Sequence, residues 1–545
     1  MRLTKTALLF CACSSVRAYV WPSPYDLLED QYTVSSGFGD GGIVDGVDPC
    51  SLGPIGGRIP GRQAAAEWLR LAYHDTATHD IETGLGGLDA SIGFETGRQQ
   101  NVGRGMNDSL VFFGAFQSRN SSMADVIALS VILAIKNCGG PSIPFRAGRI
   151  DAESAGPETV PEPQQDLESH ASSFAHQGFN VTEMIGLVAC GHTMGGVHQV
   201  DFPFTVQNAI SSSNPDGMAH FDDSFDSFDN HIATQWIDGT TANPLATGFN
   251  TTTNSDARIF AADGNKTMRA FAQNPNLFSA QCGSLLERML NTVPRTVQLS
   301  EVIEPLPLKP YQLSLNMASN GSLMLSGYIR IFGTSVEAAA ATPAAMPVSL
   351  NWKDRNGQTN VAYSTSAAAV SQTSASLWGS VRFFEINVAI DAYLGISSFV
   401  VDWAYSSQLP LTHSDNGGDG FPLQDVILNV PEKSCKDFSQ HTVTVYGVIR
   451  TDMGPISNPY VDYNSNVNQE GNIVVKQVTT RAALARVDGS ASPLYDTYSA
   501  TFTDGGQFTD EGVVTLDLVV DAGGKRYVSA KNPEIFRNCR VPVVR

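Results

Sequence analysis

The stretch LRLAYHDTATHD, residues 69–80, places an arginine, a tyrosine and a histidine in a segment that otherwise has the pattern of a buried helix. Residues three and four apart share one face of a helix, so Arg70, Tyr73 and His74 point the same way. Taken alone, such a segment is more often a helix end with a paired arginine and a hydrogen-bonded histidine than a reactive site. Its meaning depends on what the rest of the chain supplies.

Two later segments supply partners for a site of this kind. LVACGHTMGG places His192 at the end of an apolar helix, and RIFAADGNKTM places Asp263 at the start of another. An acid–base histidine with an arginine on one helix, a histidine on a second helix, and an aspartate to orient that second histidine are the equipment of a haem peroxidase. Asp263 has an alternative role as a helix N-cap, which the sequence around it also allows.

The chain from about residue 50 to residue 295 resembles the haem peroxidase superfamily of plants, fungi and bacteria, and its secreted fungal branch more than the intracellular one. Nine matching segments follow the family's order, which argues against chance. They are LRLAYHD, GGLDASIGFE, ETGRQQNVG, ADVIALSVILAIKNCGG, AGRID, VPEP, GLVACGHTMGG, HFDDSFDSFDNH and IFAAD. The resemblance implies a mainly helical domain that binds haem b.

The resemblance also implies a role for each residue of the site. His74 would move a proton between the two oxygens of peroxide as a general acid–base, and Arg70 would stabilise the negative charge that develops there. Asn101 would accept the hydrogen bond that fixes the tautomer of His74, with a loop cap as its alternative role. His192 would bind the haem iron, and Asp263 would accept its other N–H.

Two aromatic residues complete the expected haem pocket. Phe221 stands where the secreted fungal branch has a phenylalanine and the intracellular branch a tryptophan. Tyr73 stands where relatives usually have phenylalanine or tryptophan, which leaves the reaction rate and the radical location open. Gln63, Glu67 and His198 match the three carboxylates of manganese-oxidising relatives, so efficient Mn²⁺ oxidation is not expected.

Two calcium sites are implied by the same resemblance, because each combines carboxylate, hydroxyl and carbonyl oxygens, which Ca²⁺ prefers. The distal site would consist of Asp75, Gly87, Asp89 and Ser91. The proximal site would consist of Thr193, Asp222, Ser224, Asp229 and the carbonyl group of Ser227. An acidic loop without a metal is the alternative for the proximal set.

The N-terminus indicates export. Residues 1–18 have a basic start, a short apolar run and a small-x-small ending, which predicts a secretory signal peptide. Six cysteines remain after its removal, in a compartment where disulfides persist. The simplest pairing joins Cys50 to Cys138 and Cys435 to Cys539, while Cys190 and Cys282 either pair or stay as buried thiols. Six glycosylation sequons begin at Asn107, Asn120, Asn180, Asn250, Asn265 and Asn320.

One sequon has a competing role, because Asn180 also begins a capping box for the helix that follows. The net charge of −20 argues against nucleic acid or an anionic membrane as a partner. We therefore expect a secreted, extracellular glycoprotein with a haem peroxidase domain at residues 19–305.

Residues 306–545 have a different pattern, with short alternating runs separated by Gly, Asn, Asp and Pro, which predicts a β-sandwich-like region. The low-complexity stretch VEAAAATPAAMPVS, residues 336–349, is expected to be a loop rather than a helix and a candidate seam between two β modules. Four aromatic residues are candidates either for sugar stacking or for the sandwich core. They are Trp352, Trp378, Trp403 and Tyr405.

These patterns predict a peroxidase that reduces H2O2 and oxidises small donors, phenolics or similar molecules, by one-electron steps at the haem edge. The alternative is a peroxidase-fold protein whose β-rich half binds polysaccharide or cell-wall material. The presence of five residues of the expected active site favours the enzyme, because a binding module has no need for all five. This set is Arg70, His74, Asn101, His192 and Asp263.

Overall fold

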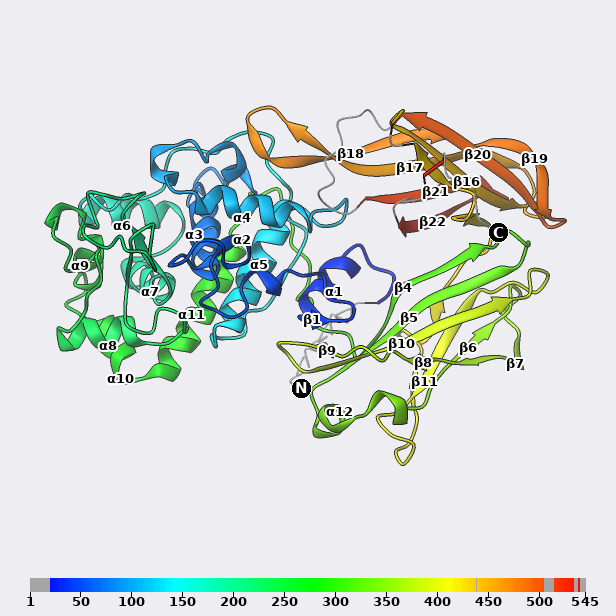
Figure 1. The fold of residues 1–545 in the computed structure, drawn as a ribbon, viewed down its shortest axis with the longest axis horizontal. Coiled ribbons are helices and arrows are strands. Elements are labelled where there is room, and N and C mark those ends of the chain that lie inside the picture. The colour runs from blue at the N-terminus through cyan, green and yellow to red at the C-terminus, as the bar shows by residue number, and fades with distance from the viewer. Residues whose placement is uncertain (1–19, 438, 504–513, 534–537, 540–545) are drawn as a thin grey trace, which may run out of the picture.

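The computed structural model describes residues 20–437, 439–503, 514–533 and 538–539. Figure 1 shows a helical half, coloured blue to green, beside a half built of strands, coloured green to red. The last helix of the helical half ends at Leu290, and the first long strand of the other half begins at Leu308. The predicted fold class, a mainly helical domain followed by a β-sandwich-like region, is therefore confirmed. The predicted signal peptide lies outside the described residues.

The helical half is organised around α5, in which every residue from Met123 to Ile135 is buried. A helix that is apolar on all sides occupies the centre of a domain, and α3 packs against it. The α-helices of the N-terminal segment and this half are α1 (Asp26–Thr33), α2 (Pro54–Gly57), α3 (Ala64–Thr76), α4 (Gly105–Gly114), α5 (Met123–Asn137), α6 (Leu167–His176), α7 (Val181–Gly191), α8 (His231–Asp238), α9 (Ser255–Phe260), α10 (Lys266–Gln273) and α11 (Pro275–Leu290).

Helix α7 begins and ends where its sequence predicts. The side chain of Asn180 accepts a hydrogen bond from Glu183 N, and the Glu183 carboxylate accepts one from Asn180 N, which completes the predicted capping box. His192 is the C-cap of this helix, so the turn that ends α7 also presents the imidazole. A short hairpin of β2 (Gly196–His198) and β3 (Met218–His220) follows it.

The strands of the other half form two sandwiches. The first packs the sheet β4-β5-β10-β8 on the sheet β12-β11-β6-β7, with β13 pairing β11. Its strands are β4 (Leu308–Met317), β5 (Leu323–Gly333), β6 (Val348–Lys353), β7 (Thr359–Ser366), β8 (Ala368–Ala369), β10 (Ser380–Ile390), β11 (Ser398–Trp403), β12 (Thr412–Ser414) and β13 (Phe421–Pro422). In addition, β1 (Ser36–Gly37) pairs with β9 (Ser374–Ala375).

The second sandwich packs the sheet β14-β16-β20-β19 on the sheet β18-β17-β21-β22, with β15 pairing β16. Its strands are β14 (Ile427–Asn429), β15 (Cys435–Asp437), β16 (Thr442–Arg450), β17 (Ile456–Gln469), β18 (Asn472–Ala483), β19 (Ala485–Ser492), β20 (Tyr495–Thr503), β21 (Thr515–Ala522) and β22 (Lys525–Pro533). The β-rich half is therefore made of two modules.

The boundary between these modules was predicted wrongly. Residues 336–349 lie inside the first sandwich, between β5 and β6, and the chain passes to the second sandwich only between β13 and β14. The stretch is also not all loop, because α12 covers Val336–Ala340 and the Ser335 hydroxyl caps it by accepting from Ala338 N. The alanine-rich run before Pro343 is long enough for one capped turn of helix.

The four candidate sugar-stacking aromatics take part in packing. Trp352 and Trp403 are 8% and 5% exposed in the core of the first sandwich, where Tyr405 packs edge-on against Trp403. Trp378 is half-buried between the two halves and donates a hydrogen bond to the carbonyl of Tyr32. Trp352 and Trp403 are therefore core residues, and Tyr405 and Trp378 are half-buried against other parts of the chain.

The N-terminal segment ties the two halves together. Glu29 on α1 has no exposed surface and accepts hydrogen bonds from Lys309 at 2.7 Å and from Arg330 at 2.5 and 2.9 Å. Burial alone would raise the pKa of Glu29, but the charges of Arg330 and Lys309 lower it to about 2. One turn later, Tyr32 packs on Phe145 of the helical half. Figure 1 shows α1 between α5 and the strands β4 and β5.

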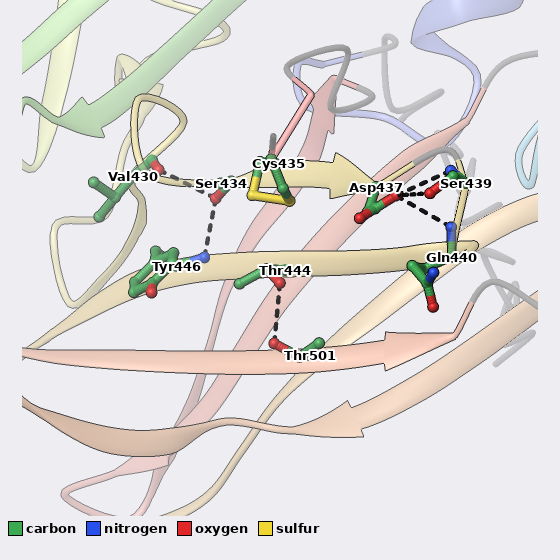
Figure 2. Close-up of a disulfide and its surroundings, with 10 residues drawn as sticks. Val430, Ser434, Cys435, Asp437, Ser439, Gln440, Thr444, Tyr446 and Thr501 are labelled. Atoms are coloured by element: carbon green, nitrogen blue, oxygen red, sulfur yellow. Dashed lines mark hydrogen bonds between the residues drawn. A yellow bond between two sulfur atoms is a disulfide. The ribbon is translucent and has the colours of Figure 1, made fainter. Parts of the chain in front are cut away.

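Three disulfides hold the halves internally, and their pairings are Cys50–Cys138, Cys190–Cys282 and Cys435–Cys539. The first and third were predicted, and the second resolves the pair that was left open. Figure 2 shows the third disulfide beside Ser434, whose hydroxyl donates to Val430 O and accepts from Tyr446 N. None of the helices in the described part of the chain has the length and hydropathy needed to cross a bilayer.

Candidate functional site

A cavity of about 900 Å³ lies in the helical half and receives the predicted site residues from two helices. Arg70, Tyr73 and His74 line it from α3, and His192 lines it from the end of α7. Its size is that of a cofactor pocket. The sequence segments that were far apart therefore meet at one cavity.

His74 is held in one tautomer by its neighbour. Its Nδ1 lies 2.8 Å from Asn101 Oδ1, and Asn101 Nδ2 donates to Glu95 O at 3.0 Å, which fixes the amide orientation. The amide oxygen can only accept, so Nδ1 carries the proton and Nε2 is the basic nitrogen. Burial, followed by the charge of Arg70, lowers the pKa of His74 to about 3.

Arg70 is a half-buried cation beside this histidine. Its Nη2 donates to Val102 O at 2.9 Å, and its guanidinium lies 5.5 Å from the ring centroid of Phe202. Burial lowers the pKa of Arg70 to about 10, which leaves the group charged at neutral pH. The cavity therefore holds one neutral base and one fixed positive charge next to each other.

The three positions matching the manganese ligands lie on the wall of the same cavity, but an arginine sits among them. Arg62 donates to Glu67 Oε1 at 2.9 Å and to Asp201 Oδ2 at 2.8 Å, and it also donates to Asp216. His198 Nε2 lies 4.0 Å from the same Glu67 oxygen. The one acidic member of the set is thus already neutralised by a buried cation.

His192 has a charged partner. Its Nδ1 lies 2.9 Å from Asp256 Oδ2, which also accepts from Asn243 Nδ2 at 2.7 Å. Asp256 and Asn243 have no exposed surface. The ring of Phe221 stacks on the imidazole at 4.2 Å with an interplanar angle of 14°. Because Nδ1 is occupied, Nε2 is the nitrogen of His192 left for a ligand in the cavity.

The prediction that Asp263 orients His192 is wrong, because Asp256 occupies that place. Asp263 instead caps α10, accepting from Lys266 N at 2.9 Å and from Thr267 N and Oγ1. Two short helices, α9 and α10, follow one another here, and each has an aspartate at or near its start. The segment NSDAR places Asp256 in the first turn of α9, but this local signal does not distinguish it from Asp263 at the start of α10.

Tyr73 faces the cavity with a phenol. Its ring stacks on Phe174 at 5.7 Å and meets His74 edge-on. Burial raises the pKa of Tyr73 above the ordinary value of 10.0, so the hydroxyl stays protonated. A neutral, buried phenol beside the base is therefore a feature of this pocket.

The residues predicted for the distal calcium site gather where α3 ends, with Asp75 in its last turn. Asp75 has no exposed surface, and its carboxylate accepts from Asp89 N at 2.9 Å and from Ser91 Oγ at 3.4 Å. Gly87 lies two residues before Asp89, and its N–H donates to Thr78 Oγ1. Burial, followed by the Asp89 carboxylate, raises the pKa of Asp75.

The residues predicted for the proximal site also converge. Thr193 Oγ1 donates to Asp229 O at 2.5 Å, and Ser224 Oγ donates to Asp229 Oδ1 at 3.0 Å. Asp222 is 5% exposed, and its Oδ2 has no hydrogen-bond partner. Burial, followed by the Asp229 carboxylate, raises the pKa of Asp222 to about 7. Ser227 closes the turn by donating its N–H to Ser224 O.

Within the described ranges, no three His, Cys, Asp or Glu side chains come together as a metal site. A cation at either of these two turns would therefore also need hydroxyl and carbonyl ligands, which is the composition that the sequence predicts.

Two histidines from different helices thus meet at a common cavity, one paired with an amide and the other with a carboxylate, which is the arrangement that the resemblance to haem peroxidases predicts. The comparison with known families agrees, because residues 58–274 match the family described as peroxidase. The chain thus contains a peroxidase domain of the superfamily found in plants, fungi and bacteria.

Three similar proteins illustrate the range of relatives. A WSC domain-containing protein of Arthroderma benhamiae is 41% identical over 62% of this chain and 46% of its own length. The peroxisomal L-ascorbate peroxidase 5 of Arabidopsis thaliana is 32% identical over 26% of this chain and 51% of its own length. The mitochondrial cytochrome c peroxidase of Emericella nidulans is 29% identical over 24% of this chain and 37% of its own length.

The chain therefore spans about half the length of the first two relatives. The match to the A. benhamiae protein covers 342 residues, which is longer than the whole segment 1–305, so it extends into the β-rich half. That relative shares more than the peroxidase domain with this chain.

We expect His74 to stay neutral where an ordinary histidine titrates. Its pKa is lowered to about 3, whereas the bond to Asp223 raises the pKa of the half-exposed His231. In an NMR titration of the chain, the ring signals of His74 should not move between about pH 8 and about pH 5, while those of His231 titrate. His74→Gln assigns the signal, and a His74 midpoint above about pH 6 would contradict the expectation.

The lowered pKa of His74 also makes the free energy of unfolding depend on pH. The folded state resists protonation of His74, while the unfolded state takes up a proton near the ordinary pKa of 6.5. The contribution of His74 to the free energy of unfolding is therefore fully present above 6.5 and is lost as the pH falls toward about 3.

Proposed function

We propose that this protein is a secreted haem peroxidase that reduces H2O2 to water and oxidises two donor molecules by one electron each. The observation that carries the proposal is the pair of differently partnered histidines, His74 with Asn101 and His192 with Asp256, at a single cavity. A structural core histidine needs one satisfied partner, but it does not need a free nitrogen facing a cavity of about 900 Å³.

The residues of the cavity suit haem b. His192 Nε2 is free to bind iron, because the Nδ1–H group donates its hydrogen bond to Asp256, which makes the imidazole more electron-donating. Phe221 supports the ring by stacking on it. Haem bound here would supply the iron that takes two oxidising equivalents from peroxide and passes them on singly to donors.

The other histidine handles the proton. His74 Nε2 would take the proton from the H2O2 oxygen nearer the iron and deliver it to the other oxygen, which leaves as water. Its low pKa keeps it neutral and ready to accept at neutral pH. Arg70, charged and half-buried beside it, would stabilise the negative charge that builds up as the O–O bond breaks.

The mouth of the cavity suits small aromatic donors such as phenolics. Phe204 is 78% exposed there, next to Pro203 and Phe202. Exposed aromatic and apolar side chains beside a cavity offer a stacking surface for a ring. The manganese route is not favoured, because Arg62 already pairs with Glu67.

We also propose that the chain binds calcium at the two turns beside the histidines. The supporting observation is the unpartnered, buried Oδ2 of Asp222, which lies among the hydroxyl and carboxylate oxygens of Thr193, Ser224 and Asp229. A divalent cation would satisfy that oxygen and offset the crowded carboxylates. Each site adjoins a histidine, since Asp75 follows His74 and Thr193 follows His192.

Secretion is proposed from the predicted signal at residues 1–18 and from the three disulfides, which persist in oxidising compartments. The alternative function, a glycan-binding surface protein, is not favoured by the four aromatic residues that suggested it. All four pack into the interior or between the halves.

The first prediction of this proposal concerns the distal base. The secreted chain should carry haem, and His74→Ala should lower the rate of its reaction with H2O2 by about 10²- to 10⁴-fold, because the proton transfer is lost. Stopped-flow absorbance at the haem band measures the rate. His413→Ala, at an exposed position of the first sandwich, is the matched control and should react like the wild type. A wild-type chain without haem, or with haem indifferent to peroxide, would overturn the proposal.

A second prediction separates the two aspartates. Asp256→Asn should lower the rate with H2O2 by about 10- to 100-fold, because it removes the charged partner of His192. Asp263→Asn should leave the rate unchanged, because Asp263 does not line the cavity and bonds only to the start of α10. Equal effects of the two substitutions would contradict the assignment of Asp256.

A third prediction concerns calcium. Metal analysis of the purified chain should find two calcium ions, and Asp222→Asn should lose one of them, because the substitution removes the unpartnered carboxylate oxygen. Asp223→Asn, at the neighbouring exposed position, should retain both. Retention of both ions by the Asp222→Asn variant would rule out the proximal site as proposed.

A further inference from the structure

A two-stranded ribbon leaves the second sandwich and reaches the helical half. Pairing of β17 with β21 ends at Asn464 opposite Thr515, but pairing of β17 with β18 continues to Gln469 opposite Asn472. We call residues 465–478 the arm. Figure 1 shows it in orange, extending from the second sandwich toward α4. A two-stranded ribbon alone is only marginally stable in water, so the arm needs a surface to rest on.

The arm rests on the peroxidase domain. Val474 is 3% exposed and belongs to the hydrophobic core of the helical half. The next carbonyl, that of Val475, accepts from the buried amide of Gln117 at 3.2 Å. At the base of the arm, Arg119 forms a salt bridge with Asp517 of β21 at 2.7 Å. The contact thus combines apolar burial, a buried hydrogen bond and an ion pair.

The surface under the tip of the arm is the 3₁₀ turn η2 (Ser91–Phe94). A Cβ added at Gly93 would lie 2.3 Å from Asn472 Oδ1 and 2.7 Å from Val474 Cγ2. The two segments therefore approach as closely as a glycine permits. Any displacement of the arm toward η2 must displace η2 as well, because no free space separates them.

The turn η2 is bonded on both sides to the distal residues. On one side, Ile92 N donates to Asp75 Oδ1 at 2.9 Å, next to His74 in the chain. On the other side, Glu95 follows η2 directly, and its carbonyl accepts from Asn101 Nδ2, whose amide oxygen accepts from His74. The turn therefore lies between the arm and the group that sets the tautomer of His74.

We propose that the arm is a positioning element of the distal site, in which Asn472 and Val474 hold η2 so that Asn101 stays aligned with His74. This inference rests on the proposed peroxidase function. It gives the β-rich half a role in the reaction with H2O2 rather than in attachment to a polymer. Neither residue touches the cavity, so both act through η2 and are positioning residues.

The test uses variants of the full chain. Val474→Ser should lower the rate with H2O2 by about 10- to 100-fold, because His74 is misplaced. The milder Val474→Ala should lower it less. The KM for a phenolic donor should not change, since the cavity mouth is untouched. Glu470→Ala, at an exposed position of the same arm, is the matched control and should behave like the wild type.

A readout independent of haem distinguishes this inference from the proposed function. Amide hydrogen exchange of the Val474 variants should increase at residues 90–101 and stay unchanged in α5. Unchanged exchange at 90–101, or faster exchange throughout α5, would overturn the positioning role. If the wild type fails to react with peroxide, the proposed function fails, and the exchange data alone then decide whether the arm holds Asn101.

A substitution on the other side of the contact gives a second check. Gly93→Ala should mimic the Val474 variants, because the added methyl group displaces the arm. Its effect should shrink when it is combined with Asn472→Gly and Val474→Ala, which remove the two atoms it meets. Additive effects on the rate and on the exchange would contradict direct contact between the arm and η2.

Discussion

The arrangement of the whole chain depends on one buried carboxylate. Glu29 lies without exposure between Lys309 and Arg330, and a buried charge is tolerated only when its partners are in place. Removing one partner of such a cluster costs about 3–5 kcal/mol. The N-terminal segment must therefore sit against the first sandwich, and Tyr32 of the same helix packs on the helical half. This constraint fixes the β-rich half relative to the peroxidase domain, and the reach of the arm depends on it.

Within the peroxidase domain, two histidines are given different chemistry by different partners. Asn101 fixes the tautomer of His74, and burial together with the charge of Arg70 keeps that ring neutral by lowering its pKa more than the Asn101 hydrogen bond raises it. Asp256 is a carboxylate and favours electron donation by His192. Both histidines keep Nε2 free because Nδ1 is occupied. The two histidines therefore differ in chemistry because their hydrogen-bond partners differ, while the imidazole groups are the same.

The sequence was sufficient for residues whose position follows from helix geometry. Arg70, Tyr73 and His74 line one cavity because they share a face of α3, and His192 joins them because α7 ends there. It was insufficient for Asp256, because two aspartates seven residues apart both stand at helix starts and only tertiary packing decides which one meets the imidazole. Local pattern ranks such candidates poorly when the loop between elements is irregular.

The module boundary and the arm were missed for a related reason. An alanine-rich stretch with prolines looks like a linker, yet Ser335 caps it into a helix inside a sandwich. The arm alternates like any other strand pair, and no local signal marks the point where β21 stops pairing. Long-range contacts of this kind are set by the packing of whole modules, which a periodicity cannot encode.

Gly93 carries information about how the two halves belong together. Its backbone is not in the left-handed region, so the glycine is not demanded by its own conformation. What demands it is the approach of Asn472 and Val474 from the other end of the chain. In a peroxidase domain that worked alone, the outer side of this turn would face water and would accept a side chain. The glycine at this place is therefore explained by a contact with the β-rich half and not by the conformation of its own backbone.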